Sequence, residues 1–214
     1  MTYKAVLFDM DGVLIESEEL IAKCAILALA DFGVHAKPED FVPFVGCGED
    51  RYIGGVSEKY GVKYDLAMKK RCYEYYGQLV DDEAKRPERI LELLDTLKER
   101  GYKLAVCTSS DYMKASANLR AIGAREDIFD VFITGDDITN KKPDPEIYLK
   151  GSRMIGVAPE ECMVVEDAPN GIQAAHAGGM KAIGVATSFS AETLKEQAGP
   201  DYLVSKLIDI LTIL

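Results

Sequence analysis

Residues 4–13 read KAVLFDMDGV, an apolar run that ends in two aspartates separated by one residue. The run up to Phe8 predicts a buried strand, because a short apolar stretch bounded by a turn signal is typical of a strand covered on both faces. Asp9 and Asp11 then leave the sheet together in a loop that Gly12 allows to turn. Since Asp-Gly is also a common turn dipeptide, this stretch alone indicates either a turn or a functional site.

The rest of the chain divides into a helical segment and an alternating segment. From about residue 85, β-rich runs alternate with helical stretches, which is typical of βαβ units around a parallel sheet. Strands are expected at 103–107, 131–134, 162–165 and 181–185, and helices from Pro87 to Gly101, at 110–122, 145–155 and 169–177, and from about 205. Between about 16 and 84 the pattern is helical only, at 19–32, from Pro38, after Gly48 and at 64–80. We therefore expect one domain from residues 1–15 plus 85–214, an inserted all-helical domain at 16–84, and a cleft between them.

Composition excludes several classes of protein. The 214 residues carry 25 Lys and Arg against 36 Asp and Glu, a net charge of −11, and no basic stripe, which argues against a nucleic-acid partner. No apolar run is long enough for a signal peptide or a membrane helix, so we expect a cytoplasmic protein with no membrane partner. The five cysteines are scattered and form no Cys-x-x-Cys pair, which predicts reduced core thiols.

A second acidic strand end repeats the first. The run from Cys162 to Val165 is followed by Glu166 and Asp167. Two parallel strands that end in acids bring up to four carboxylates to one edge of a sheet, and such a cluster needs a cation. Because oxygen ligands favour hard ions, Mg²⁺ is expected first and Mn²⁺ second.

Two further strand ends complement the acids. The strand at 103–107 leads into Thr108 and Ser109, which offer a hydroxyl and the free N–H groups of a helix start to an anion. The strand at 131–134 leads to a loop in which two prolines flank Asp144 and can aim Lys142. Ligands of open α/β sheets bind at these carboxyl ends, and four ends that offer acids, hydroxyls and a cation indicate a functional site rather than chance.

The motifs together resemble those of a known family. Asp9-Met10-Asp11-Gly12-Val13, Thr108, Lys142-Pro143-Asp144-Pro145 and Glu166-Asp167 match, in order and spacing, the four motifs of the haloacid dehalogenase superfamily, in its phosphatase branch. The chain as a whole is similar to the β-phosphoglucomutase and phosphoglycolate phosphatase group. The resemblance implies an α/β fold with a Rossmann-like parallel sheet core and an inserted helical C1 cap.

The resemblance also implies a phosphoaspartate mechanism. Asp9 is expected as the nucleophile on phosphorus and Asp11 as the general acid and base. Mg²⁺ is expected on Asp9, the backbone carbonyl of Asp11 and Asp167, with Glu166 in direct or water-mediated support. Thr108, the backbone at Ser109, and Lys142 are expected to hold the phosphoryl oxygens.

The cap is expected to choose the substrate. β-Phosphoglucomutases carry a histidine close to the position of Ile21, and its absence here disfavours a sugar-phosphate mutase. The glycine-containing stretch at 41–51 resembles the substrate-specificity loop, where Glu49 or Arg51 would contact a substrate's polar end. A helix-capping turn with solvent-exposed charges is the alternative for this stretch.

Three functions remain open from the sequence. The leading one is Mg²⁺-dependent hydrolysis of a small phosphomonoester, such as a sugar phosphate or similar metabolite. A phosphomutase is the second, and a non-catalytic regulatory module on the same scaffold is the third. We expect a monomer or a weak dimer.

Overall fold

A six-stranded, all-parallel sheet forms the centre of the larger part of the molecule. The structure, a computed structural model, describes residues 3–44, 48–125 and 127–214. The strand order is β3-β2-β1-β4-β5-β6, and every neighbouring pair is parallel. The strands are β1 (Ala5–Phe8), β2 (Lys103–Cys107), β3 (Val131–Ile133), β4 (Cys162–Glu166), β5 (Lys181–Val185) and β6 (Tyr202–Val204). The expected α/β fold is confirmed.

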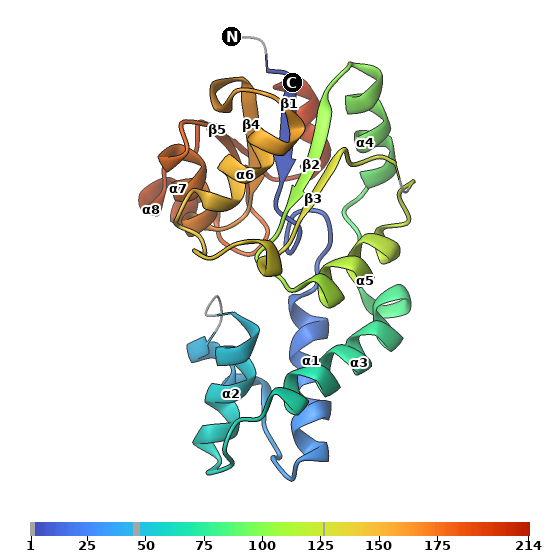
Figure 1. Cartoon of the computed structure of the whole chain (residues 1–214), viewed down its shortest axis with the longest axis vertical. Coiled ribbons are helices and arrows are strands. Elements are labelled where there is room, and N and C mark those ends of the chain that lie inside the picture. The colour runs from blue at the N-terminus through green and yellow to red at the C-terminus, as the bar shows by residue number, and fades with distance from the viewer. Residues whose placement is uncertain (1–2, 45–47, 126) are drawn as a thin grey trace.

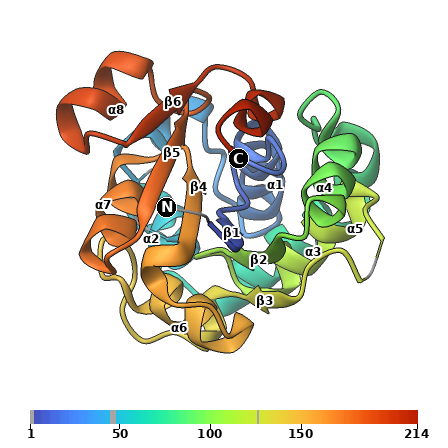
Figure 2. The same ribbon diagram turned by 90° about the horizontal axis from the view of Figure 1, so that it is seen from above.

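Helices cover both faces of the sheet, because successive strand residues point to opposite sides. One face packs on α6 (Glu146–Ile155), α7 (Pro169–Ala177) and α8 (Ala191–Gln197), and the other on α4 (Ile90–Glu99) and the 3₁₀ helix Leu207–Thr212 (Figure 2). Within β1, Leu7 belongs to the first layer and Val6 and Phe8 to the second, all fully buried. Both apolar faces of the strands are therefore buried, each under its own layer of helices, as the sequence indicated.

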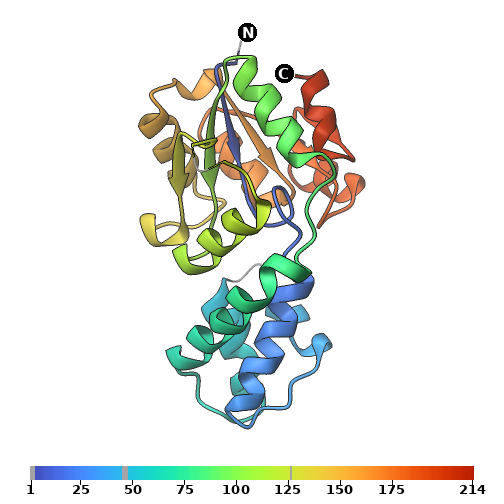
Figure 3. The ribbon, with the colours of Figure 1, turned by 90° about the vertical axis from the view of Figure 1, so that its right-hand side faces the viewer.

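Three further helices form a separate group below the sheet. They are α1 (Glu18–Asp31), α2 (Glu49–Lys59) and α3 (Leu66–Glu83), which we call the helical insert together with their connections at 16–84 (Figures 1 and 3). The chain enters and leaves it side by side, since the N–H of Glu16 donates to the carbonyl of Lys85 at 2.8 Å. Helix α3 packs on α1 and also on α5 (Tyr112–Ile122) of the larger part. The insert therefore contacts the larger part mainly through α5.

Several sequence expectations for individual elements were wrong. Pro38 opens only a 3₁₀ turn, Pro38–Asp40, which the Asp40 side chain closes by accepting from the N–H of Lys37. Helix α4 begins at Ile90 rather than Pro87, after Arg89 in the left-handed region at φ 60°. Helix α8 and strand β6 were missed because a seven-residue polar helix and a three-residue strand carry almost no periodic signal.

Among the described residues, no helix combines the length and the apolar content that crossing a bilayer requires. The four cysteines that the structure describes at 24, 72, 107 and 162 are buried and free, as expected, while Cys47 lies outside the described residues.

Candidate active site

Three neighbouring strands end at the same edge of the sheet and open into a cleft of about 1120 Å³. Strand β1 lies between β2 and β4, so their carboxyl ends bring Asp9, Thr108 and Asp167 together. The helical insert lies across the cleft and contributes Ile21, Glu49 and other residues to its wall. The motifs that the sequence singled out at strand ends thus share one cavity, as the position of ligand sites in open α/β sheets predicts.

The ammonium group of Lys142 lies between the carboxylates of Asp9 and Glu166. Its ammonium donates to Asp9 Oδ1 at 2.5 Å and to Glu166 Oε1 at 2.7 Å, and only 5% of its side chain is exposed. The hydroxyl of Tyr148 also donates to Glu166 Oε1, at 2.8 Å. The second Glu166 oxygen accepts from the N–H groups of Asp167 and Ala168. Glu166 therefore links Lys142 and Tyr148 to the start of its own loop.

The carboxyl groups of Asp9 and Asp167 have raised pKa values, which the positive charge of Lys142 lowers only in part. Burial raises the pKa of Asp9 to about 7, and the nearby carboxylates of Glu166 and Asp11 add to this, while Lys142 opposes it. Burial, together with Glu166 and Asp9, also raises the pKa of Asp167 well above its ordinary value. Burial and the neighbouring negative charges thus both favour the protonated forms of these acids, and a cation beside them would oppose both effects.

These acids fit a divalent cation. Asp9, Glu166 and Asp167 each offer an oxygen within 4.8 Å of the others, and all three residues are buried. The donor set is oxygen only, which is the set that Mg²⁺ prefers. A Cβ on Gly12 would lie 1.9 Å from Asp167 Oδ2, so only a glycine lets this loop pass so close to the carboxylate.

Asp11 is surrounded by hydrogen-bond donors. Its carboxylate accepts from Ser110 Oγ at 2.6 Å, Lys114 Nζ at 2.9 Å, Asn118 Nδ2 at 3.1 Å and Ser17 Oγ. Burial alone would raise the pKa of Asp11, but Lys114 and the hydrogen bonds from Ser110 and Ser17 hold it below its ordinary value. Asp11 is therefore held as a carboxylate.

Sequence reasoning missed most of these partners of Asp11. Lys114 and Asn118 lie four residues apart on one face of α5, and Ser110 lies four residues before Lys114, just ahead of the helix. That spacing was the available signal, although the same spacing is common on solvent-exposed helix faces. Ser17 directly precedes α1, a position where serine commonly caps a helix, but its hydroxyl donates to Asp11 and makes no cap hydrogen bond.

The expected phosphate-binding residues also line the cleft. Thr108 is buried, its hydroxyl accepts from the N–H of Ser110 at 3.1 Å, and Ser109 follows it along the wall. Both lie just before α5, whose first N–H groups lack intrahelical partners. Together with Lys142, they surround the cleft side of Asp9 with donors suited to an anion.

The two expected specificity residues have different surroundings. Glu49 lines the cleft and faces Ser110 at 3.3 Å and Lys114 at 3.6 Å. Arg51 instead pairs with Glu58 at 2.8 Å, lies over the ring of Phe44, and is not among the described residues that line the cleft. Residues 45–47 of the expected specificity loop lie outside the described part of the chain.

Comparison with known proteins gives consistent matches. The family model described as "Haloacid dehalogenase-like hydrolase" matches residues 6–185. Protein SUPPRESSOR OF QUENCHING 1, chloroplastic, of Arabidopsis thaliana is 42% identical over 206 residues, 93% of this chain, which spans only 19% of that relative's length. Pyrophosphatase PpaX of Bacillus cereus is 28% identical over 215 residues, an alignment that covers 100% of this chain and 97% of the length of that relative. A crystal structure of a predicted phosphoglycolate phosphatase from Haemophilus somnus superposes with a TM-score of 0.87 at 25% identity, covering 100% of this chain and 98% of that one.

Proposed function

The chain belongs to the haloacid dehalogenase-like hydrolase family, and on that premise we propose that it hydrolyses a small phosphomonoester with Mg²⁺ through a phosphoaspartate at Asp9. The observation that carries the proposal is the meeting of Asp9, Asp11 and the Lys142 ammonium at the end of β1. A nucleophile, a cation for the phosphoryl group and an acid–base carboxylate meet there in one cleft.

The first half-reaction transfers the phosphoryl group to the protein. A carboxylate oxygen of Asp9 attacks phosphorus and the bond from phosphorus to the ester oxygen breaks. Asp11, in the protonated form that the second half-reaction restores, gives that oxygen a proton. Lys142, the Thr108 hydroxyl and the Ser109 backbone hold the phosphoryl oxygens, on which charge spreads in the transition state.

The second half-reaction frees phosphate. Water attacks the phosphorus of the acyl phosphate while Asp11 takes its proton, the bond to Asp9 breaks, and inorganic phosphate leaves. Asp9 and Asp167, with the backbone carbonyl of Asp11 and support from Glu166, would hold Mg²⁺, which supplies charge that lets a carboxylate approach a phosphate.

We place substrate choice in the helical insert, acting as a cap over a core of residues 1–15 plus 85–214. A small metabolite suits a cleft that is roofed by the insert, and Glu49 is the insert's charged side chain at its wall. A phosphomutase remains the second candidate for the same chemistry. Ile21, which lines the cleft where a mutase would present a histidine, favours hydrolysis.

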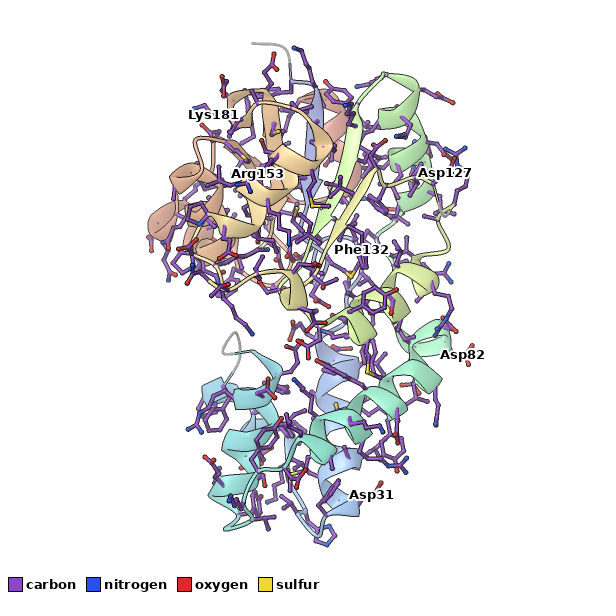
Figure 4. All side chains as sticks on the ribbon, in the orientation of Figure 1. Asp31, Asp82, Asp127, Phe132, Arg153 and Lys181 are labelled. Carbon is purple, nitrogen blue, oxygen red and sulfur yellow. The ribbon has the colours of Figure 1, made fainter. Side chains whose placement is uncertain are left out.

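The test measures phosphate release from sugar phosphates, phosphoglycolate, nucleotides and pyrophosphate, with Mg²⁺ or with EDTA. Asp9→Asn is compared with Asp127→Asn, a control on the outer side of the molecule (Figure 4). We expect release that needs both Mg²⁺ and Asp9 and is unchanged by Asp127→Asn. Isomerised ester without free phosphate, followed by phosphorus NMR, would establish the mutase instead. No turnover of either kind would support a non-catalytic module.

A further inference from the structure

The loop that follows β5 reaches the same edge of the sheet as the expected catalytic residues. Thr187 and Ser188 lie two and three residues beyond the end of β5 and line the cleft. Strand β5 pairs with β4, whose end leads to Asp167, while β1 lies on the other side of β4. The reaction proposed above uses no residue of this loop, so the role of its hydroxyls is open.

The hydroxyl of Thr187 joins two loops whose strands are not neighbours. Its Oγ1 donates to the backbone carbonyl of Gly12 at 2.6 Å and lies 3.4 Å from Asp167 Oδ2. A threonine hydroxyl has a single proton, which the much shorter distance assigns to the Gly12 carbonyl. The loop after β1 is thus tied to the loop after β5, beside the acid that follows the strand between them.

The backbone of Gly12 needs such a tie. Its φ is +80°, and a Cβ there would lie 1.9 Å from Asp167 Oδ2 and 2.6 Å from Ser188 Oγ. Glycine fits this position, but it also restricts the backbone least. Two hydrogen bonds restrict it instead. The N–H of Gly12 donates to the carbonyl of Ile15 at 2.8 Å within the loop, and Thr187 donates to the Gly12 carbonyl from outside it.

The two peptide planes that meet at Gly12 include one of the expected metal ligands. The first plane contains the carbonyl of Asp11, a backbone group whose direction no side-chain rotamer can adjust. The bond at the Gly12 N–H holds this plane, and the bond at the Gly12 carbonyl holds the second. Loss of the Thr187 hydroxyl would free the second plane, and rotation about the Gly12 backbone bonds would then change the direction of the Asp11 carbonyl relative to Asp167.

We propose that Thr187 is a positioning residue for the divalent cation. Its hydroxyl holds the Gly12 loop beside Asp167, so that the Asp11 carbonyl and the Asp167 carboxylate keep a fixed spacing. The inference rests on the Mg²⁺-dependent phosphatase function proposed above. It gives the site a residue from a strand end that supplies neither the nucleophile, nor the acid–base carboxylate, nor a metal ligand.

The test measures Mg²⁺ affinity from the rise of Tm with Mg²⁺ concentration in differential scanning calorimetry. Thr187→Val keeps the shape of the side chain and removes its proton donor. We expect the Kd for Mg²⁺ to rise about tenfold or more, within the ~10–100-fold range that is typical when the partner of a metal ligand is removed. The Tm in EDTA should change by less than about 2 °C, because Thr187 is exposed and water can bond to the freed carbonyl.

Thr187→Ser separates the hydroxyl from the shape of the side chain. This variant keeps the proton donor and loses only the methyl group, so its Kd for Mg²⁺ should return close to the wild-type value. If serine does not restore the affinity, or if Thr187→Val leaves the Kd unchanged, the hydroxyl does not position the cation and the proposal is wrong.

Kinetics distinguish positioning of the metal from contact with the substrate. In Thr187→Val, the Mg²⁺ concentration that gives half-maximal phosphate release should rise in parallel with the Kd. At saturating Mg²⁺, kcat and KM for the ester should return close to their wild-type values, because the Thr187 hydrogen bond goes to the Gly12 loop. A raised KM at saturating Mg²⁺, with an unchanged Kd for Mg²⁺, would make Thr187 a substrate contact and overturn the proposal.

A matched control applies the same substitution in the next helix. Thr193 of α8 bonds Ser190 at 3.1 Å, and neither is among the described residues that line the cleft. Thr193→Val should leave the Kd for Mg²⁺ unchanged. An equal rise in both variants would mean a general loosening of the segment after β5 and would contradict the proposal. Failure of the underlying phosphatase function looks different, because the wild type itself would then show no rise of Tm with Mg²⁺, or Asp9→Asn would still release phosphate.

Discussion

The carboxyl-terminal edge of the sheet and the helical insert place their polar side chains by different means. At the sheet edge, Asp9, Thr108 and Asp167 each lie within two residues of a strand end, and the parallel register of β1, β2 and β4 fixes where those ends meet. In the insert, the place of Glu49 depends on how α2 and α3 pack and how the insert meets α5. Strand pairing thus places the polar side chains of the sheet edge, whereas helix packing places Glu49 at the wall of the cleft.

The largest expected effect of a substitution lies at the sheet edge. Lys142→Met leaves Asp9 and Glu166 buried without their cation, which should cost about 3–5 kcal/mol of unfolding free energy. Loss of a charge that stabilises the transition state should also lower kcat by about 10²–10³. Urea denaturation and phosphate release measure the two effects. Lys141→Met, one residue earlier and exposed, is the control. Equal losses of stability and activity in the two variants would mean that the buried position of the Lys142 ammonium between Asp9 and Glu166 has no particular importance.

Metal binding should stabilise the same edge. Because burial raises the pKa values of Asp9 and Asp167, a divalent cation there relieves unfavourable charge. At about 100 times its Kd, Mg²⁺ should add ~2.7 kcal/mol, which for a chain of this size raises Tm by about 5–10 °C. Differential scanning calorimetry with Mg²⁺ and with EDTA measures the shift. Asp167→Asn should remove most of it, and an undiminished shift in that variant would place the ion elsewhere.

A smaller effect is expected where the two regions meet. The hydroxyl of Tyr76 in α3 donates to Asn118 Oδ1 at 2.5 Å, and both side chains are fully buried. Tyr76→Phe leaves that buried oxygen without its donor, which should cost about 1–3 kcal/mol in urea denaturation.

Tyr75→Phe is the matched control, since its hydroxyl bonds Asp31 at the end of the insert farthest from the sheet (Figure 4). That change should stay within about 0.5 kcal/mol, as is usual at exposed sites. Equal costs for the two tyrosines would show that the contact between α3 and α5 contributes nothing to stability.

The smallest effect is expected inside the insert and depends on pH. Hydrogen bonds from Lys59, the backbone of Lys37 and Tyr60 hold the pKa of Asp40 below its ordinary value. Since the folded pKa is the lower one, this stabilisation is complete above the ordinary aspartate pKa of about 4 and is lost as pH falls toward the depressed value. Asp40→Asn should therefore lower Tm at pH 7 by an amount that shrinks as the pH is lowered below about 4. Glu39→Gln, the exposed neighbour, should show no such trend.

Prediction from the sequence succeeded where a residue's position follows from the chain near it. Asp9, Glu166 and Lys142 were identified from strand ends and a proline-flanked loop, and the structure brings them within hydrogen-bond distance. The partners Lys114 and Asn118 were missed, because four-residue spacing on a helix does not say which face is buried. Arg51 was expected near the cleft, yet it pairs with Glu58 two turns along its own helix, a contact that the helix makes available locally.

The chain enters and leaves the insert side by side, at Glu16 and Lys85, so the insert is replaceable as a unit. Its two ends are joined to the rest of the chain at points one backbone hydrogen bond apart. A lineage can therefore lengthen, shorten or exchange the segment between them without rethreading any strand of the sheet, because no other connection has to move. Such an exchange would change the wall of the cleft, while Asp9, Thr108 and Asp167 would keep the positions that their strands give them.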